Sequence, residues 1–331
     1  MRTWTGFDTS QPSCQGSPYL MLIHLDCSDW PMAYGWGLVR DIQIGRDRLT
    51  DQSADERDWA VSEVHAEGVP MFGISYGTDA ESQRDPVAAT YAKGSLDPVY
   101  MPIQIATAVL SPGDRVLDLG AHLGGFALAA SALGCEVLAV EASPRNAALL
   151  KLSVAHNQFD KLTVVHAAVS DERGSVEFAP DGPFGHVATP KKDVPAVTVP
   201  AVRVDDLLEE LGWDSIQFVK LDVEGSEVQA LRGMPRVLSD ANAPLVFFES
   251  NTHTLGFFDQ TGEDLKAEFR RWGYVVYSVE PLALRAVKPG QEQSETVVDY
   301  LAAKVLPPAL APWTRRHGGR AASMLRRLHL L

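Results

Sequence analysis

Short apolar runs alternate with helical stretches across residues 98 to 305, and this alternation constrains the fold more than any other feature of the sequence. Continuous apolar runs are typical of parallel strands that are covered by helices on both faces. The alternation therefore predicts an α/β fold with a doubly wound, mostly parallel sheet. Seven runs have the length of buried strands, namely 115–119, 136–140, 162–166, 216–221, 244–249, 274–279 and 296–302.

The connections between these runs predict the rest of the domain. Helices are expected at 126–133, 144–156, 226–238 and 264–272. No helix separates the last two strands, which predicts an antiparallel hairpin that closes the sheet. Residues 170–211 interrupt the alternation with β-like pieces at 175–178 and 197–204 and a helix at 205–211. Such an insertion is expected to lie over a functional site.

The two ends of the chain differ from this central domain. Residues 1–97 form an irregular N-terminal cap in our interpretation, with one helix at 55–67. The cap either packs on the core, makes an oligomer contact such as a homodimer, or binds something separately. Residues 306–331 form a basic tail whose segment 323–331 has the pattern of a short amphipathic helix. That helix either docks or frays, or it makes a weak contact with an anionic membrane or a partner.

Composition narrows the partners and the compartment. The formal net charge is −14, which argues against a nucleic-acid substrate because phosphate backbones are repelled. Three scattered cysteines do not make a disulfide framework. Neither a signal peptide nor a transmembrane segment is recognisable in the sequence. These features together predict a soluble, cytoplasmic protein.

A glycine-bearing turn follows the first strand, in the segment VLDLGAHLGGF at 116–126. Its positions Asp118, Gly120 and Gly124 lie where a strand runs into a helix, the usual place for a nucleotide-like ligand. A dinucleotide fingerprint would need a glycine where this chain has His122. The anion of Asp118 favours the ammonium group of a methionine moiety. The spacing therefore favours S-adenosylmethionine, with Gly120 expected to allow close approach of the ligand.

Glu141 ends the second strand, 21 positions after Gly120. A carboxylate there can accept hydrogen bonds from both ribose hydroxyls of an adenosine. NAD enzymes place an acid similarly, so Glu141 indicates adenosine without choosing the cofactor. The predicted contact set is completed by Ala121, Ala142 and Ala168, the last of which is expected near the adenine.

A second group of polar residues follows the fourth strand, in the segment FVKLDVEGSE at 218–227. Asp222 and Glu224 are candidate catalytic acids, since two acids at a sheet edge seldom serve stability alone. Glu227 is better explained as a partner of the helix N-terminus. Glu249, which ends the fifth strand, is expected to face the same cleft. These three catalytic candidates could hold Mg²⁺, but the sequence does not place them together, and we predict no metal.

Six segments in order resemble the FkbM-type methyltransferases: VLDLGAHLGGFA, VLAVEASPRNAALL, HAAVSDERG, VPAVRVDDLL, FVKLDVEGSEVQALRGM and LVFFES. The resemblance covers residues 98 to 302 and implies a Rossmann-like class I methyltransferase sheet. It also implies S-adenosylmethionine as the cofactor and a hydroxyl of a sugar or natural product as the acceptor. Cofactor contacts at Asp118, Gly120, Gly124 and Glu141 are implied as well. The family usually has Asn at the position of His122.

The expected chemistry is in-line methyl transfer to a substrate oxygen, with the protein positioning the acceptor and removing its proton. Asp222, Glu224 or a histidine is the candidate base, and the histidines are His122, His186 and His253. Two alternatives remain open at this point. One is an NAD-dependent oxidoreductase, and the other is a non-catalytic binding protein on the same fold.

Overall fold

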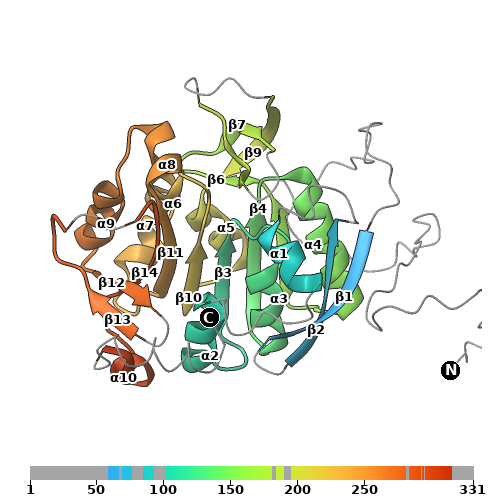
Figure 1. The fold of residues 1–331 in the computed structure, drawn as a ribbon, viewed down its shortest axis with the longest axis horizontal. Helices are drawn as coiled ribbons and strands as arrows, with labels where there is room; N and C mark the ends of the chain where they lie inside the picture. The colour runs from blue at the N-terminus through green and yellow to red at the C-terminus, as the bar shows by residue number, and fades with distance from the viewer. Residues whose placement is uncertain are drawn as a thin grey trace, which may run out of the picture.

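The structure is a computed structural model that describes residues 59–66, 69–76, 85–92, 101–180, 184–189, 195–280, 283–291, 293 and 295–314. An eight-stranded sheet lies at its centre, in the order β13-β12-β14-β11-β10-β3-β4-β5 (Figure 1). Its strands are β3 (Arg115–Leu119), β4 (Glu136–Glu141), β5 (Leu162–His166), β10 (Phe218–Leu221), β11 (Leu245–Asn251), β12 (Val275–Glu280), β13 (Ala283–Ala286) and β14 (Val297–Ala303).

The pairing confirms the predicted α/β sheet and corrects its edge. Strands β11, β10, β3, β4 and β5 pair in parallel. Strand β14 inserts between β11 and β12 and runs antiparallel to both. The antiparallel closure is therefore confirmed. The eighth strand, β13, was not predicted, because its four residues between β12 and β14 are too few to stand out as an apolar run.

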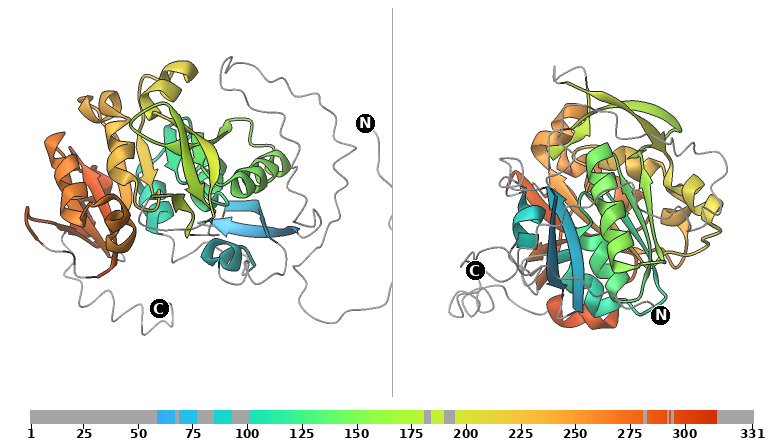
Figure 2. Two further views of the ribbon diagram at one scale, coloured as in Figure 1. Left: turned by 90° about the horizontal axis from the view of Figure 1, so that it is seen from above. Right: turned by 90° about the vertical axis from the view of Figure 1, so that its right-hand side faces the viewer.

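Helices cover both faces of this sheet, because alternate residues of each strand point to opposite sides. On β3, Val116 packs with one core and Leu117 with the other. The first core includes residues of α2 (Met101–Val109), α3 (Gly125–Ala132) and α4 (Pro144–Asn157). The second includes residues of α5 (Val204–Leu211), α6 (Glu227–Arg232), α7 (Pro235–Ser239) and α9 (Gly262–Arg271). Figure 2 shows the helices on the two faces of the sheet from two further directions.

One predicted helix, 226–238, is broken in two. Helix α6 ends at Arg232, and α7 begins at Pro235. A proline in a helix interior would lose a hydrogen bond and clash with the preceding turn, whereas the first helical position tolerates it. The single helix expected from the apolar pattern is therefore two short helices.

The N-terminal cap is more regular than expected over its described part. Strands β1 (Trp59–Ala66) and β2 (Val69–Tyr76) form an antiparallel hairpin, followed by α1 (Pro86–Ala92). The helix predicted at 55–67 is wrong for residues 59–66. Ser62 and Val64 are buried, while Glu63 and His65 are exposed, so the true period is two residues.

The hairpin is attached to the core through helix α4. The amide of Asn157 bonds both backbone groups of Phe72, with N···O distances of 2.7 and 2.6 Å. The hydroxyl of Ser153 accepts a hydrogen bond from the backbone N–H of Ile74 at 2.9 Å. Side chains of the helix thus satisfy polar groups at the open edge of the hairpin.

The predicted insertion forms a second sheet together with the preceding residues 168–169, in the order β6-β9-β7-β8, above the carboxyl ends of the central strands (Figure 1). Its strands are β6 (Ala168–Val169), β7 (Gly174–Ala179), β8 (His186–Val187) and β9 (Val197–Val202). The remaining elements are α8 (Thr252–Leu255), η3 (Gly256–Phe258), η4 (Pro308–Leu310) and α10 (Ala311–Thr314). Of the described helices, none is long and apolar enough to cross a membrane. The helix predicted at 323–331 lies outside the described residues.

Candidate active site

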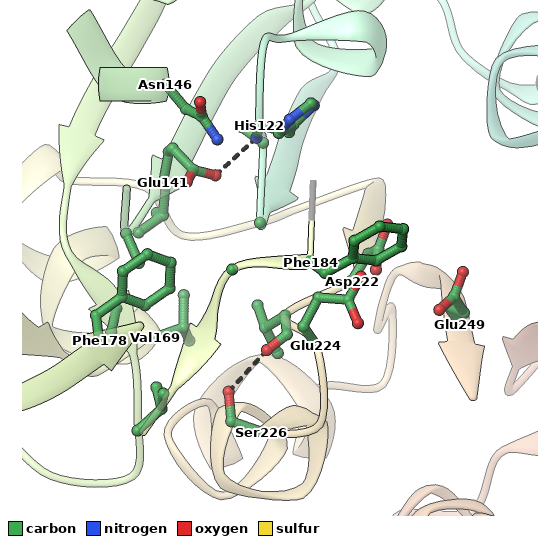
Figure 3. A pocket seen from close by; sticks show the side chains of 18 of the residues that line it. His122, Glu141, Asn146, Val169, Phe178, Phe184, Asp222, Glu224, Ser226 and Glu249 are labelled. Carbon is green, nitrogen blue, oxygen red and sulfur yellow. Dashed lines mark hydrogen bonds between the residues drawn. The ribbon is translucent and has the colours of Figure 1, made fainter. Parts of the chain in front are cut away.

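A cavity of about 350 Å³ opens where β3, β4, β10 and β11 end, a size within the usual range for small-molecule sites. Glu141 and His122 lie at one end, and Glu249 lies at the other (Figure 3). The second sheet contributes part of the wall, as predicted for the insertion. The predicted cofactor contacts Ala121, Ala142 and Ala168 all line the cavity. Other lining residues include Val87, Gly120, His122, Glu141, Phe178, Phe184, Lys220, Asp222, Glu224 and Glu249.

Gly120 allows a close approach, but of a different group from the one expected. Its φ is +80°, and a Cβ there would lie 1.7 Å from the carbonyl oxygen of Asp222. The glycine therefore lets the loop after β3 pack against the turn after β10. A collision with the ligand itself is not what demands glycine at this position. Packing of the two turns brings the predicted cofactor end and the predicted catalytic end into one cavity.

We expect Gly120→Ala to lower the free energy of unfolding by about 4 kcal/mol or more, since backbone would have to move. Gly113→Ala is the matched control, because Gly113 has a φ of +91° and open space around it. The free energy of unfolding of Gly113→Ala should fall by only about 1 to 2 kcal/mol, the cost of placing alanine in a left-handed conformation. Chemical denaturation of both variants measures the difference. Equal losses in the two variants would contradict the close approach.

Glu141 holds the loop and faces the cavity at once. Its side chain is only 6% exposed. Oε2 accepts a hydrogen bond from the backbone N–H of His122 at 2.7 Å (Figure 3). Oε1 accepts one from the backbone N–H of Ser143 at 2.8 Å. Burial raises the pKa of Glu141, and His122 is the largest opposing influence. A preoriented carboxylate at this edge fits the ribose of an adenosine ligand.

Asp118 and Gly124 support the loop from behind the cavity wall. Asp118 is fully buried, and its Oδ2 accepts a hydrogen bond from Ala127 N–H at the start of α3, at 2.9 Å. Burial raises the pKa of Asp118 to about 6, although Lys220 opposes this. Gly124, at φ +87°, packs against Leu150. Neither residue lines the cavity, so their part in cofactor binding stays a prediction.

Lys220 is a site residue that the sequence analysis missed. Its side chain is buried in β10, directly opposite Asp118 on the neighbouring parallel strand. The ammonium group lies 3.1 Å from Asp222 Oδ2, 3.2 Å from the Gly120 carbonyl oxygen and 3.6 Å from Asp118 Oδ1. A lysine within an otherwise apolar strand was the available signal. Lys220 links the loop after β3 to the turn after β10.

The three predicted catalytic acids meet in the cavity. Oxygen atoms of Asp222, Glu224 and Glu249 lie within 4.8 Å of one another. Burial, followed by the charge of Asp222, raises the pKa of Glu224 to about 8 and that of Glu249 to about 9. Two of the three carboxyls therefore hold protons near neutral pH. The geometry also fits a divalent cation, which the sequence alone could not show.

The turn after β10 has an unusual backbone conformation that Glu227 stabilises. Glu224 adopts a left-handed conformation at φ 49°, followed by Gly225 at φ 103°. Glu227 Oε1 accepts hydrogen bonds from the N–H groups of Gly225 at 3.1 Å and Val223 at 3.3 Å. Glu227 thus holds the turn, as predicted for a residue at the start of a helix.

Of the three candidate histidines, only His122 lines the cavity. His186 is 2% exposed, outside the cavity wall, with Nδ1 2.9 Å from the Phe184 carbonyl oxygen. His253 is exposed on α8. This placement removes His186 and His253 from the candidates for the base.

Comparison with known families decides what this site belongs to. Residues 118–291 match the methyltransferase FkbM domain, which is more than half of the 331 residues. The chain belongs to the FkbM methyltransferase family. Membership confirms the resemblance found in the sequence and makes S-adenosylmethionine the cofactor. Membership of a methyltransferase family also argues against the alternative of an NAD-dependent oxidoreductase.

Individual relatives of this FkbM-family chain are distant. The 2-O-methyltransferase NoeI of Sinorhizobium fredii is 26% identical over 156 residues, which span 41% of this chain and 63% of NoeI. The 23S rRNA (uracil(1939)-C(5))-methyltransferase RlmD of Shewanella sp. (strain MR-7) is 30% identical over 112 residues, 31% of this chain and 24% of RlmD. A TehB-like methyltransferase from Corynebacterium glutamicum has a TM-score of 0.40 at 13% identity, covering 65% of this chain and 91% of that one.

Proposed function

We propose that this FkbM-family protein transfers a methyl group to a hydroxyl of a sugar or small natural product. The observation that carries the proposal is the meeting of Asp222, Glu224 and Glu249 in the cavity that Glu141 also lines. S-adenosylmethionine, when bound, supplies a methyl group that is already activated by the sulfonium. The chain must therefore bind the cofactor, orient the acceptor and take up one proton.

Asp222 is the proposed base. Its carboxylate forms an ion pair with Lys220, in a cavity where the neighbouring Glu224 and Glu249 hold protons. A charged carboxylate can accept the hydroxyl proton as the oxygen–methyl bond forms. The two protonated glutamic acids can donate hydrogen bonds to other oxygens of the acceptor. Pairs of acids whose environments separate their pKa values commonly divide such roles.

The charges in the cavity favour a neutral, hydroxyl-bearing acceptor. Among the described lining residues, Lys220 is the only lysine or arginine, and Asp222 already pairs with it. A phosphate or carboxylate on the acceptor would face the acids without a free cation. Phe184, which is 58% exposed, offers an apolar surface at the cavity. The name of NoeI, a 2-O-methyltransferase, also favours oxygen as the acceptor atom.

A labelled-methyl assay tests this function. The full chain is incubated with S-adenosylmethionine labelled in its methyl group and with separate panels of glycosides, polyols, amines and RNA. We expect label in hydroxyl-bearing small molecules. Label in RNA alone would overturn the proposal in favour of the acceptor type named for RlmD. No transfer to any panel would favour the non-catalytic alternative.

The raised pKa values of the acids predict a pH-dependent stability. Burial and the charge of Asp222 raise the pKa of Glu249 in the folded chain from its ordinary 4.5 to about 9. The folded state therefore binds more protons between these limits, so the free energy of unfolding falls as the pH rises through them. Glu249→Gln cannot ionise and should lose less Tm between pH 6 and pH 9. Glu295→Gln, at an exposed position, is the control. If Tm falls with pH equally in the wild type and in both variants, Glu249 is not the source of the pH dependence.

We expect methyl transfer to need no added metal. A divalent cation at Asp222, Glu224 and Glu249 would have to displace the protons that the two glutamic acids hold near neutral pH. Treatment of the enzyme with EDTA, followed by dialysis, should leave the rate unchanged. Loss of activity that Mg²⁺ restores would show that the cluster binds a cation after all.

A further inference from the structure

The cofactor loop is contacted by a part of the chain that precedes the family match. Two residues of the 85–92 segment, both fully buried, make these contacts. The hydroxyl of Tyr91 donates a hydrogen bond to the Leu123 carbonyl oxygen at 2.9 Å. Oδ2 of Asp85 lies 2.9 Å from Nε2 of His122. Helix α1 also contributes Val87 to the cavity wall.

The two oxygens of Asp85 serve different partners. Oδ1 accepts hydrogen bonds from the N–H groups of Val87 and Ala88, both at 2.9 Å, and so caps α1. Oδ2 faces His122. A buried carboxylate oxygen is costly unless a donor or cation compensates it. Of the described residues, His122 is the one whose ring nitrogen lies within ion-pair distance of this oxygen.

The contact with Asp85 holds His122, which has an unusual backbone conformation, next to Glu141. His122 has a φ of 53°, a conformation that side-chain-bearing residues rarely adopt. In this conformation its backbone N–H points to Glu141 Oε2, 2.7 Å away. A contact that holds the His122 ring therefore also holds the loop and the carboxylate expected at the ribose. Such strain persists where the surroundings over-determine it, and Asp85 is part of those surroundings.

We propose that Asp85 is a positioning residue for S-adenosylmethionine, acting through His122 on the loop and on Glu141. The segment 85–92 is then part of the cofactor site. This inference rests on the proposed function only in that it needs the chain to bind the cofactor. Asp85 is separated from His122 by 36 residues, so no local sequence motif joins them.

Asp85→Ser separates this role from capping, because serine is a good helix cap but lacks the second oxygen. We expect the variant to bind S-adenosylhomocysteine about tenfold more weakly by calorimetry, with a Tm close to that of the wild type. Asp85→Thr, which also caps, is the second variant in case the first does not fold. His122→Ala should weaken binding by a similar factor.

The double variant gives the decisive comparison. If Asp85 acts through His122, adding Asp85→Ser to His122→Ala should weaken binding no further. Two losses that multiply would show that Asp85 acts elsewhere and would overturn the inference. Wild-type affinity in both Asp85 variants would overturn it as well. A wild type that does not bind S-adenosylhomocysteine would instead overturn the proposed function and this inference together.

Discussion

Asp222→Asn is expected to lower kcat for methyl transfer by about 10²- to 10⁴-fold, the range that general-base catalysis supplies. Asparagine keeps the shape of the side chain but cannot take up the proton of the acceptor. Affinity for S-adenosylhomocysteine should stay within about threefold of wild type, because Glu141 and the loop remain in place. Single-turnover rates and calorimetric titration of the same preparation measure the two quantities.

Asp299→Asn is a demanding control for this experiment. Asp299 lies opposite Glu249 on the neighbouring strand β14, but it does not line the cavity. Its loss should change kcat by no more than about threefold. If Asp222→Asn keeps full activity, Asp222 is not the base. A similar large loss in both variants would mean that the charge of the region matters rather than the proton acceptor.

Glu141→Ala is expected to weaken S-adenosylhomocysteine binding by about 10- to 100-fold, the loss of one or two hydrogen bonds to a charged group. Two causes act in the same direction. The ribose loses its expected acceptor, and the N–H groups of His122 and Ser143 lose theirs. The loop then loses one of the contacts that hold His122 in its left-handed conformation. Calorimetric titration of the variant beside the wild type measures the change.

Glu136→Ala is the matched control, because Glu136 begins the same strand and forms only partly exposed ion pairs with Arg115 and Lys161. Pairs of this kind contribute little to stability. We expect its S-adenosylhomocysteine affinity to equal that of the wild type. An unchanged affinity in Glu141→Ala would place the ribose elsewhere in the cavity.

The central strands were predictable because their residues obey one local rule. Apolar residues dominate the runs at 115–119 and 136–140, as is typical of parallel strands buried on both faces. The structure assigns β3 to the same residues and extends β4 by one, to Glu141. The shared location of Glu141, Asp222 and Glu249 was predictable as well. Each lies at the end of a parallel strand, and these ends meet at one edge of the sheet.

The errors lie where distant residues decide the outcome. Residues 59–66 carry apolar side chains that fit a helix or a strand, and pairing with β2 selects the strand. Strand β13 exists because β12 offers it an edge. Lys220 lies opposite Asp118, and Asp85 contacts His122. The partners of each pair are far apart in the sequence. Contacts of this kind leave no local period, so pattern analysis cannot find them.

The most direct test is calorimetric titration of the full chain with S-adenosylhomocysteine. The cavity joins a preoriented Glu141 to the acid cluster at Asp222 through the packing of two turns. We predict one site with micromolar affinity, about −8 kcal/mol in free energy. Absence of both heat and thermal stabilisation would contradict the assignment of this cavity to S-adenosylmethionine and, with it, the proposed methyl transfer.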